Sequence, residues 1–171
     1  MEPRRQKHQI CVQVAIDCDD AEVDLSDLTE TAQAVCRRFD LADATVDIAI
    51  VDDAGFRRLN KQFRHSDTVS DCLSFDLSDD SKPDSPRAFE LALNVQQAAR
   101  EAELRGHSVR AELALYLVHG LLHNLGFDDA TEDQALAMHD MEDKILQELG
   151  YGSVYNTKAK ALKFRDKDIH Q

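Results

Sequence analysis

The feature that most constrains the fold is a stretch from Ala111 to Leu125 that is apolar on nearly every side of a helix. A helix that is hydrophobic all round must be covered on all sides by other elements. Ser108 is placed to cap its start, and Gly126 is placed to end it in a left-handed conformation. The sequence therefore predicts a buried central helix whose apolar residues are Leu113, Leu115, Leu117, Val118, Leu121, Leu122 and Leu125.

The same segment carries His119 and His123, four residues apart. Side chains at this spacing lie on one side of a helix, so the two imidazoles can converge on one point. After Gly126 the chain can turn back and bring Asp129 to that point. Two imidazoles and a carboxylate with an open fourth position are typical of a catalytic zinc site. The alternative is a pair of core histidines that meet by chance, but buried histidines need partners, and a metal ion is a good one.

Gly120 stands directly after the first histidine. Metalloproteases with two histidines on one helix have a glutamate at this position, which acts as the general base. Its absence argues against peptide hydrolysis, but not against water activated by a metal ion. Glycine inside a helix costs about 1 kcal/mol relative to alanine, so we expect close approach of another backbone or of substrate there.

Alternating apolar residues predict strands at 10–16 and 44–51, and shorter strands are expected at 72–75 and 89–94. Helices are expected at 26–39, after Asp52 or Asp53, at 95–105, at 111–125 and from Thr131 to about 149, with Ser26 or Asp27 capping the first. The polar, proline-containing segment 78–87 is expected to be a surface loop. Four strands and five helices in mixed order predict an α+β fold, with a small mixed four-stranded sheet packed against the helices and the metal site on the fourth helix.

The length of 171 residues is sufficient for one domain with a substantial core. We expect a single domain over residues 1–171, with its core at about 10–150 and a basic C-terminal tail at 153–171. No apolar run has the length of a membrane span, and the polar N-terminus is unlike a signal peptide. We therefore expect no membrane partner. Four cysteines without CxxC pairing indicate reduced thiols, and hence a cytoplasmic protein: Cys11, Cys18, Cys36 and Cys72.

The formal net charge of −13 argues against a protein that coats nucleic acid non-specifically. The two ends of the chain are nevertheless basic, since residues 157–171 hold five lysines and arginines against two aspartates, and Arg4, Arg5 and Lys7 outweigh Glu2. These ends are either solvated tails or basic arms that hold a polyanion near an acidic body.

Several motifs, in order and at compatible spacing over residues 45–150, resemble the YbeY family of single-strand-specific endoribonucleases, also called rRNA maturation factors. The first block is Leu59-Asn60, Arg64 and Ser70-Asp71-Cys72-Leu73-Ser74-Phe75. The second is Gly106-His107-Ser108, Glu112-Leu113 and Val118-His119-Gly120-Leu121-Leu122-His123, and the third is Met141-Glu142 with Ile145-Leu146.

The resemblance implies one zinc ion, no organic cofactor, and water-mediated cleavage of single-stranded RNA in 16S rRNA 3′-end processing, with the small ribosomal subunit as partner. It implies His119, His123 and Asp129 as metal ligands, although the family usually has histidine at the third position. A carboxylate still binds zinc at about 2.0–2.2 Å, but it shifts the preference toward harder ions. Asp128 is the neighbouring alternative to Asp129 as the third ligand. If Asp129 is the ligand, Asp128 caps the turn or accepts a hydrogen bond from one of the ligands.

The resemblance also implies that Arg64 acts in catalysis together with His119 and His123. A guanidinium offers a fork of donors for the scissile phosphate, whereas the alternative is an ordinary surface arginine. We expect structural or surface roles for His65 and His107. The cluster of Ser70, Asp71 and Ser74 is expected to stabilise a loop beside the site.

Two other functions remain open. A zinc metallopeptidase-like hydrolase would share the histidine helix, the glycine and the carboxylate, but Gly120 disfavours it. A non-catalytic ribosome-binding factor would use the metal only for structure.

Overall fold

The computed structural model describes residues 9–19, 21–152 and 154. Within them the chain forms one α+β fold, as predicted, with the elements in the expected order. These elements are β1 (Ile10–Asp17), α1 (Leu25–Arg38), β2 (Ala44–Val51), α2 (Asp53–Arg64), β3 (Cys72–Asp76), β4 (Arg87–Asn94), α3 (Val95–Arg105), α4 (Val109–Asn124) and α5 (Glu132–Glu148).

The four strands form one mixed sheet in the order β1-β2-β4-β3. β1 pairs with β2 and β2 with β4 in parallel, whereas β3 runs antiparallel to β4. Val51 at the end of β2 therefore lies beside Asn94 at the end of β4, and Cys72 at the start of β3 lies opposite Leu93. The starts of α2 and α3 and the segment before β3 thus all meet at one end of the sheet.

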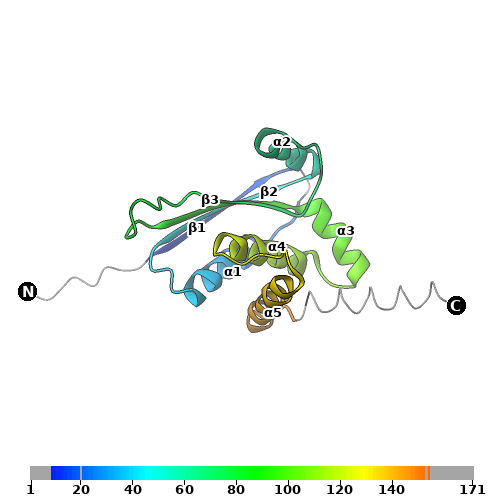
Figure 1. Cartoon of the computed structure of the whole chain (residues 1–171). Coiled ribbons are helices and arrows are strands. Elements are labelled where there is room, and N and C mark those ends of the chain that lie inside the picture. The colour runs from blue at the N-terminus through cyan, green and yellow to red at the C-terminus, as the bar shows by residue number, and fades with distance from the viewer. Residues whose placement is uncertain (1–8, 20, 153, 155–171) are drawn as a thin grey trace, which may run out of the picture.

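Helices cover the sheet unequally on its two faces. α1, α4 and α5 lie on one side of the sheet, α2 lies on the other, and α3 stands at the end (Figure 1). α4 contacts α1, α3, α5, β3 and β4. All of its residues from Ala111 to Val118 and from Gly120 to Leu122 are buried, so the prediction of a buried central helix is confirmed.

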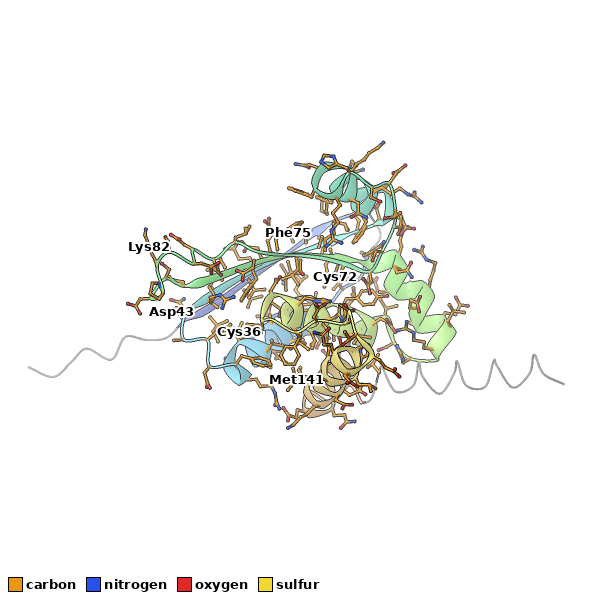
Figure 2. The ribbon with its side chains drawn as sticks, viewed as in Figure 1. Cys36, Asp43, Cys72, Phe75, Lys82 and Met141 are labelled. Atoms are coloured by element: carbon orange, nitrogen blue, oxygen red, sulfur yellow. The ribbon has the colours of Figure 1, made fainter. Side chains whose placement is uncertain are left out.

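Two apolar clusters follow from this arrangement. Alternate residues of β2, such as Val46, Ile48 and Ile50, point into the main core with α1 and α4. Val51 and Phe56 belong to a smaller cluster under α2, on the opposite face, together with Leu73 and Ala92. Side chains fill the layer between sheet and helices, where Cys36 and Cys72 also lie (Figure 2). All four cysteines are unpaired.

Several boundaries differ from the prediction by one or two residues, and two of these differences have a clear cause. α1 begins at Leu25 because Asp24 is its N-cap, and the carboxylate of Asp24 accepts from the backbone N–H of Ser26. The sequence offered Ser26 or Asp27 for this role. β4 begins at Arg87, two residues earlier than expected, because Arg87 pairs in register with Ala44 of β2. Each helix in the described ranges is too short or too polar to cross a lipid bilayer.

Candidate metal centre

His119, His123 and Asp129 come together at the C-terminal end of α4. The Nε2 atoms of the two histidines are 3.1 Å apart, and Nε2 of His123 lies 3.7 Å from Oδ2 of Asp129. One potential ligand atom from each of the three residues lies within 4.8 Å of the others. Leu125 caps the C-terminal end of α4, and Gly126 with φ of +99° turns the chain back, as the predicted left-handed stop requires.

The protons of both imidazoles are directed away from this point. Nδ1 of His119 donates to Oε1 of Glu142 at 2.6 Å, and Nδ1 of His123 donates to the carbonyl of Phe127 at 3.1 Å. In the neutral tautomers fixed by these bonds, the Nε2 lone pairs of both histidines face each other. Tetrahedral zinc with ligands at 2.0–2.1 Å holds two nitrogens about 3.3 Å apart, so the donor set fits such an ion.

The charges around His119 favour a cation. Burial disfavours the charged imidazole, but the hydrogen bond and charge of Glu142, with the charges of Asp71 and Asp129, outweigh it and raise the pKa of His119. The same negative groups that stabilise a proton at this point stabilise a metal ion there.

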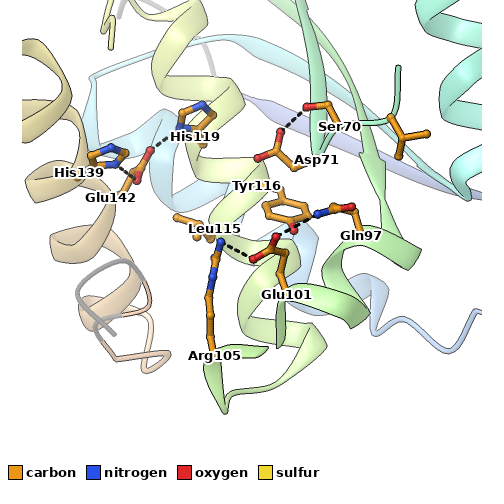
Figure 3. A pocket seen from close by; sticks show the side chains of 11 residues that line it. Ser70, Asp71, Gln97, Glu101, Arg105, Leu115, Tyr116, His119, His139 and Glu142 are labelled. Atoms are coloured by element: carbon orange, nitrogen blue, oxygen red, sulfur yellow. Dashed lines mark hydrogen bonds and ion pairs between the residues drawn. The ribbon is translucent and has the colours of Figure 1, made fainter. Parts of the chain in front are cut away.

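Glu142 is a functional residue that the sequence reasoning noted only as part of a motif. Its side chain is buried and accepts from His119 through one oxygen and from Nδ1 of His139 through the other, at 2.9 Å. Figure 3 shows the carboxylate between the two rings. One signal was available: Glu142 falls on the buried side of α5 with Met138 and Ile145, where a lone carboxylate needs partners.

Arg64, the last residue of α2, lines a cavity of about 470 Å³ that also contains His119 and His123. Arg64 is exposed and forms no ion pair with any residue that the structure describes. Its guanidinium is therefore available to an anion. Cys72 lines the same cavity, but burial and the nearby charge of Asp71 raise its pKa, so its thiol is neutral and a poor metal ligand.

Gly120 is explained by packing. A Cβ atom there would lie 2.6 Å from Cδ2 of Leu91 and 2.8 Å from Sγ of Cys72. The close approach expected at this residue is therefore made by side chains of β3 and β4 rather than by another backbone. It places the histidine helix directly against the sheet.

The remaining candidates take other positions. Asp128 accepts from the backbone N–H of Asp129 at 2.8 Å and so shapes the turn. Asp71 accepts from the hydroxyl of Ser70 at 3.1 Å and from the backbone N–H of Cys72 at 2.7 Å, which organises the segment before β3.

His65 ends α2 in a left-handed conformation, and His107 contacts buried Glu112. Neither histidine lines the cavity with Arg64. The basic residues of both termini, Arg4, Arg5 and Lys7 at one end and 157–171 at the other, lie outside the described residues.

Comparison with known proteins identifies relatives along most of the chain. The family model described as Endoribonuclease YbeY matches residues 13–150. Proteins named Endoribonuclease YbeY include one from Carboxydothermus hydrogenoformans, 39% identical over 61% of this chain and 72% of its own length. Another, from Pseudomonas putida strain W619, is 37% identical over 67% of this chain and 73% of its own. The Myxococcus xanthus protein is 34% identical over 86% of this chain but only 50% of its own length.

A Thermotoga maritima protein with a known solution structure shares the fold, with a TM-score of 0.55 over 82% of this chain and 89% of its own, at 21% identity. The family match spans α2, α4 and α5, which carry Arg64, the two histidines and Glu142 of the site described above. On these grounds the chain is a member of the YbeY endoribonuclease family.

Proposed function

We propose that this protein is a metal-dependent endoribonuclease that cleaves single-stranded RNA. The observation that carries the proposal is the convergence of His119, His123 and Asp129 beside a cavity that also holds the unpaired Arg64. The family membership supports cleavage of RNA, and the donor set supports a zinc ion.

Each side chain has a distinct role in this proposal. His119, His123 and Asp129 hold the ion, which when bound supplies Lewis-acid activation of water and of a phosphoryl oxygen. Arg64 binds the scissile phosphate with its fork of N–H donors and stabilises charge that develops on it. Glu142 keeps His119 in the tautomer with a free Nε2.

The family further supports a role in 16S rRNA 3′-end processing and ribosome maturation, with the small ribosomal subunit as partner. We infer a cytoplasmic protein, organised as one domain over residues 1–171. With a net charge of −13, the whole chain repels RNA at long range, so binding relies on the local cation at Arg64, on the metal, or on a protein partner.

The test combines metal analysis with an RNA cleavage assay. Purified protein is expected to contain stoichiometric zinc and to cut unstructured RNA but not duplex RNA. His123→Ala and Asp129→Ala are expected to abolish cleavage and metal retention. Asp128→Ala is the matched control, because Asp128 contacts only the turn and should keep most activity. Full activity in Asp129→Ala with loss in Asp128→Ala would reassign the third ligand.

The same assay decides between the alternatives. A peptidase would hydrolyse peptides and leave RNA intact. If the metal is only structural, the protein would unfold when the metal is removed and would cleave no RNA at any metal concentration. Neither alternative is supported by the relatives, which are named as endoribonucleases.

A further inference from the structure

A second cavity, of about 320 Å³, adjoins the metal centre. It lies between α3, α4, α5 and the segment before β3 (Figure 3). Its volume is in the range of about 300–1,000 Å³ typical of pockets for small ligands. It shares Ser70, Asp71 and His119 with the cavity that holds Arg64, so a strand bound at the metal centre can reach into both.

The charges in this second cavity disfavour phosphate. Three carboxylates line it, those of Asp71, Glu101 and Glu142. Its only guanidinium, that of Arg105, is 8% exposed and already paired with Glu101 at 2.6 Å and with Glu112 at 2.8 Å. The two histidines of the cavity, His119 and His139, both donate to Glu142. An anion would therefore meet carboxylates whose cationic neighbours are already engaged, whereas a neutral group with N–H donors would be attracted.

Two polar atoms in this cavity are unused by the protein. Tyr116 is 3% exposed, and its hydroxyl has no hydrogen-bond partner among the described residues. Ser70 and Cys72 both donate to Oδ1 of Asp71, which leaves Oδ2 as an acceptor. A buried polar group without a partner costs about 1–3 kcal/mol, so a ligand that satisfies it gains affinity.

We propose that this second cavity binds one nucleobase of single-stranded RNA next to the scissile phosphate, and that it selects a base with an exocyclic amino group over uracil. The inference rests on the proposed function. The amino group of cytosine donates to a carboxylate such as that of Asp71, while the hydroxyl of Tyr116 donates to the ring nitrogen beside it. Uracil presents a carbonyl oxygen in place of the amino group, and a carboxylate repels it.

The test measures binding without cleavage. Full-length protein in excess chelator is titrated into fluorescently labelled oligouridine, and into the same strand with one central cytidine. The cytidine strand is expected to bind about three- to tenfold more tightly, the effect of one net hydrogen bond. Cytosine and uracil are pyrimidines of the same size, so a difference in fit does not produce this preference, and the Tyr116→Phe variant separates hydrogen bonding from stacking.

Tyr116→Phe removes only the unpartnered hydroxyl, so the variant is expected to fold, and the preference for cytidine should fall to less than twofold. Tyr151→Phe is the matched control, since the guanidinium of Arg110 lies over the ring of Tyr151 and Tyr151 lines neither cavity. Equal affinity of the wild type for both strands overturns the inference, as does an unchanged preference in Tyr116→Phe.

The cleavage assay of the proposed function separates the two claims. RNA cleavage without a cytidine preference would overturn the base site and leave the nuclease intact. A cytidine preference without cleavage of any RNA would support the base site and remove the nuclease.

Discussion

Glu142 is the residue through which α5 acts on the metal centre. Its two carboxylate oxygens accept from His119 and His139, so replacing one oxygen by an amide N–H turns one of these contacts into a clash of donors. Glu142→Gln is expected to weaken zinc binding about 10- to 100-fold, which is the usual effect of mutating a residue that hydrogen-bonds a metal-bound histidine.

A chelator competition titration measures this change. Glu148→Gln is the control on the same helix, because Glu148 pairs only with Arg38 at the surface. Unchanged affinity in Glu142→Gln would show that His119 keeps its orientation without Glu142.

Asp129 supplies the carboxylate that joins the two imidazoles in the candidate centre. A carboxylate ligand prefers harder ions than an imidazole does. Asp129→His is therefore expected to raise the affinity for zinc relative to that for manganese. The measurement is a competition between the two ions, read by metal analysis after equilibrium dialysis. A ratio that stays constant would mean that position 129 does not set the metal preference.

At the scale of elements, the contact between α4 and the sheet depends on Gly120. Gly120→Ala introduces a methyl group at 2.6 Å from Leu91 and 2.8 Å from Cys72, and overpacking of this kind costs about 1–3 kcal/mol. Alanine regains about 1 kcal/mol of helix propensity, so a net loss of up to about 2 kcal/mol in the free energy of unfolding is expected.

Urea denaturation in a double-mutant cycle identifies the cause of this loss. Cys72→Ala removes the Sγ atom and is expected to reduce the cost of Gly120→Ala. An equal cost in both backgrounds would contradict a clash with Cys72.

α2, which ends at Arg64, is tied to α3 at its other end. Asp53 accepts from Arg100 at 2.8 Å and from Asn94 at 2.8 Å. The hydrogen bond from Arg100 lowers the pKa of Asp53, against the opposing effect of burial. Because the folded-state pKa is lowered, ionised Asp53 stabilises the fold at neutral pH, and this contribution is lost as the pH falls through the lowered value.

Asp53→Asn should therefore cost about 1 kcal/mol near neutral pH, and the cost should shrink below about pH 4. Urea midpoints of wild type and variant across this range test the expectation. As a control, Asp80→Asn in the loop between β3 and β4 is expected to change the free energy of unfolding little at neutral or at acidic pH. A cost that stays constant with pH would mean that the pair does not depend on the charge of Asp53.

The order of the elements was predictable because each has a local signal. The alternation in β2, the Ser108 cap and the stop at Gly126 are all properties of neighbouring residues. The start of β4 was missed because Arg87 joins the strand through its pairing with β2, which no local pattern contains.

The candidate site also combines features that are local in the sequence with contacts between distant residues. The histidine pair and the turn to Asp129 follow from spacing along one helix. Glu142 of α5 accepts from His119 of α4 and from His139 of its own helix. This contact depends on how α5 packs against α4, which the spacing of residues along one helix does not give.

At the scale of the whole molecule, metal binding and folding are coupled, because the ligands meet only when α4 and the following turn are formed. Zinc at 100 times its Kd is expected to stabilise the fold by about 2.7 kcal/mol, which raises Tm by about 5–10 °C. Thermal denaturation with zinc and with chelator measures this shift. His123→Ala should lose most of it, and an equal shift in that variant would place the zinc elsewhere.

The position of the histidines near the end of α4 affects which charges the candidate metal centre attracts. His119 and His123 lie in the last two turns of a helix that runs from Val109 to Asn124. The aligned peptide dipoles of such a helix place about half a negative charge at its C-terminal end, and this attracts a cation and repels an anion. The backbone of α4 therefore helps to hold the metal, while a phosphate must approach from the side of Arg64. The polarity of one buried helix thus favours a cation over an anion at this end and leaves the binding of phosphate to Arg64.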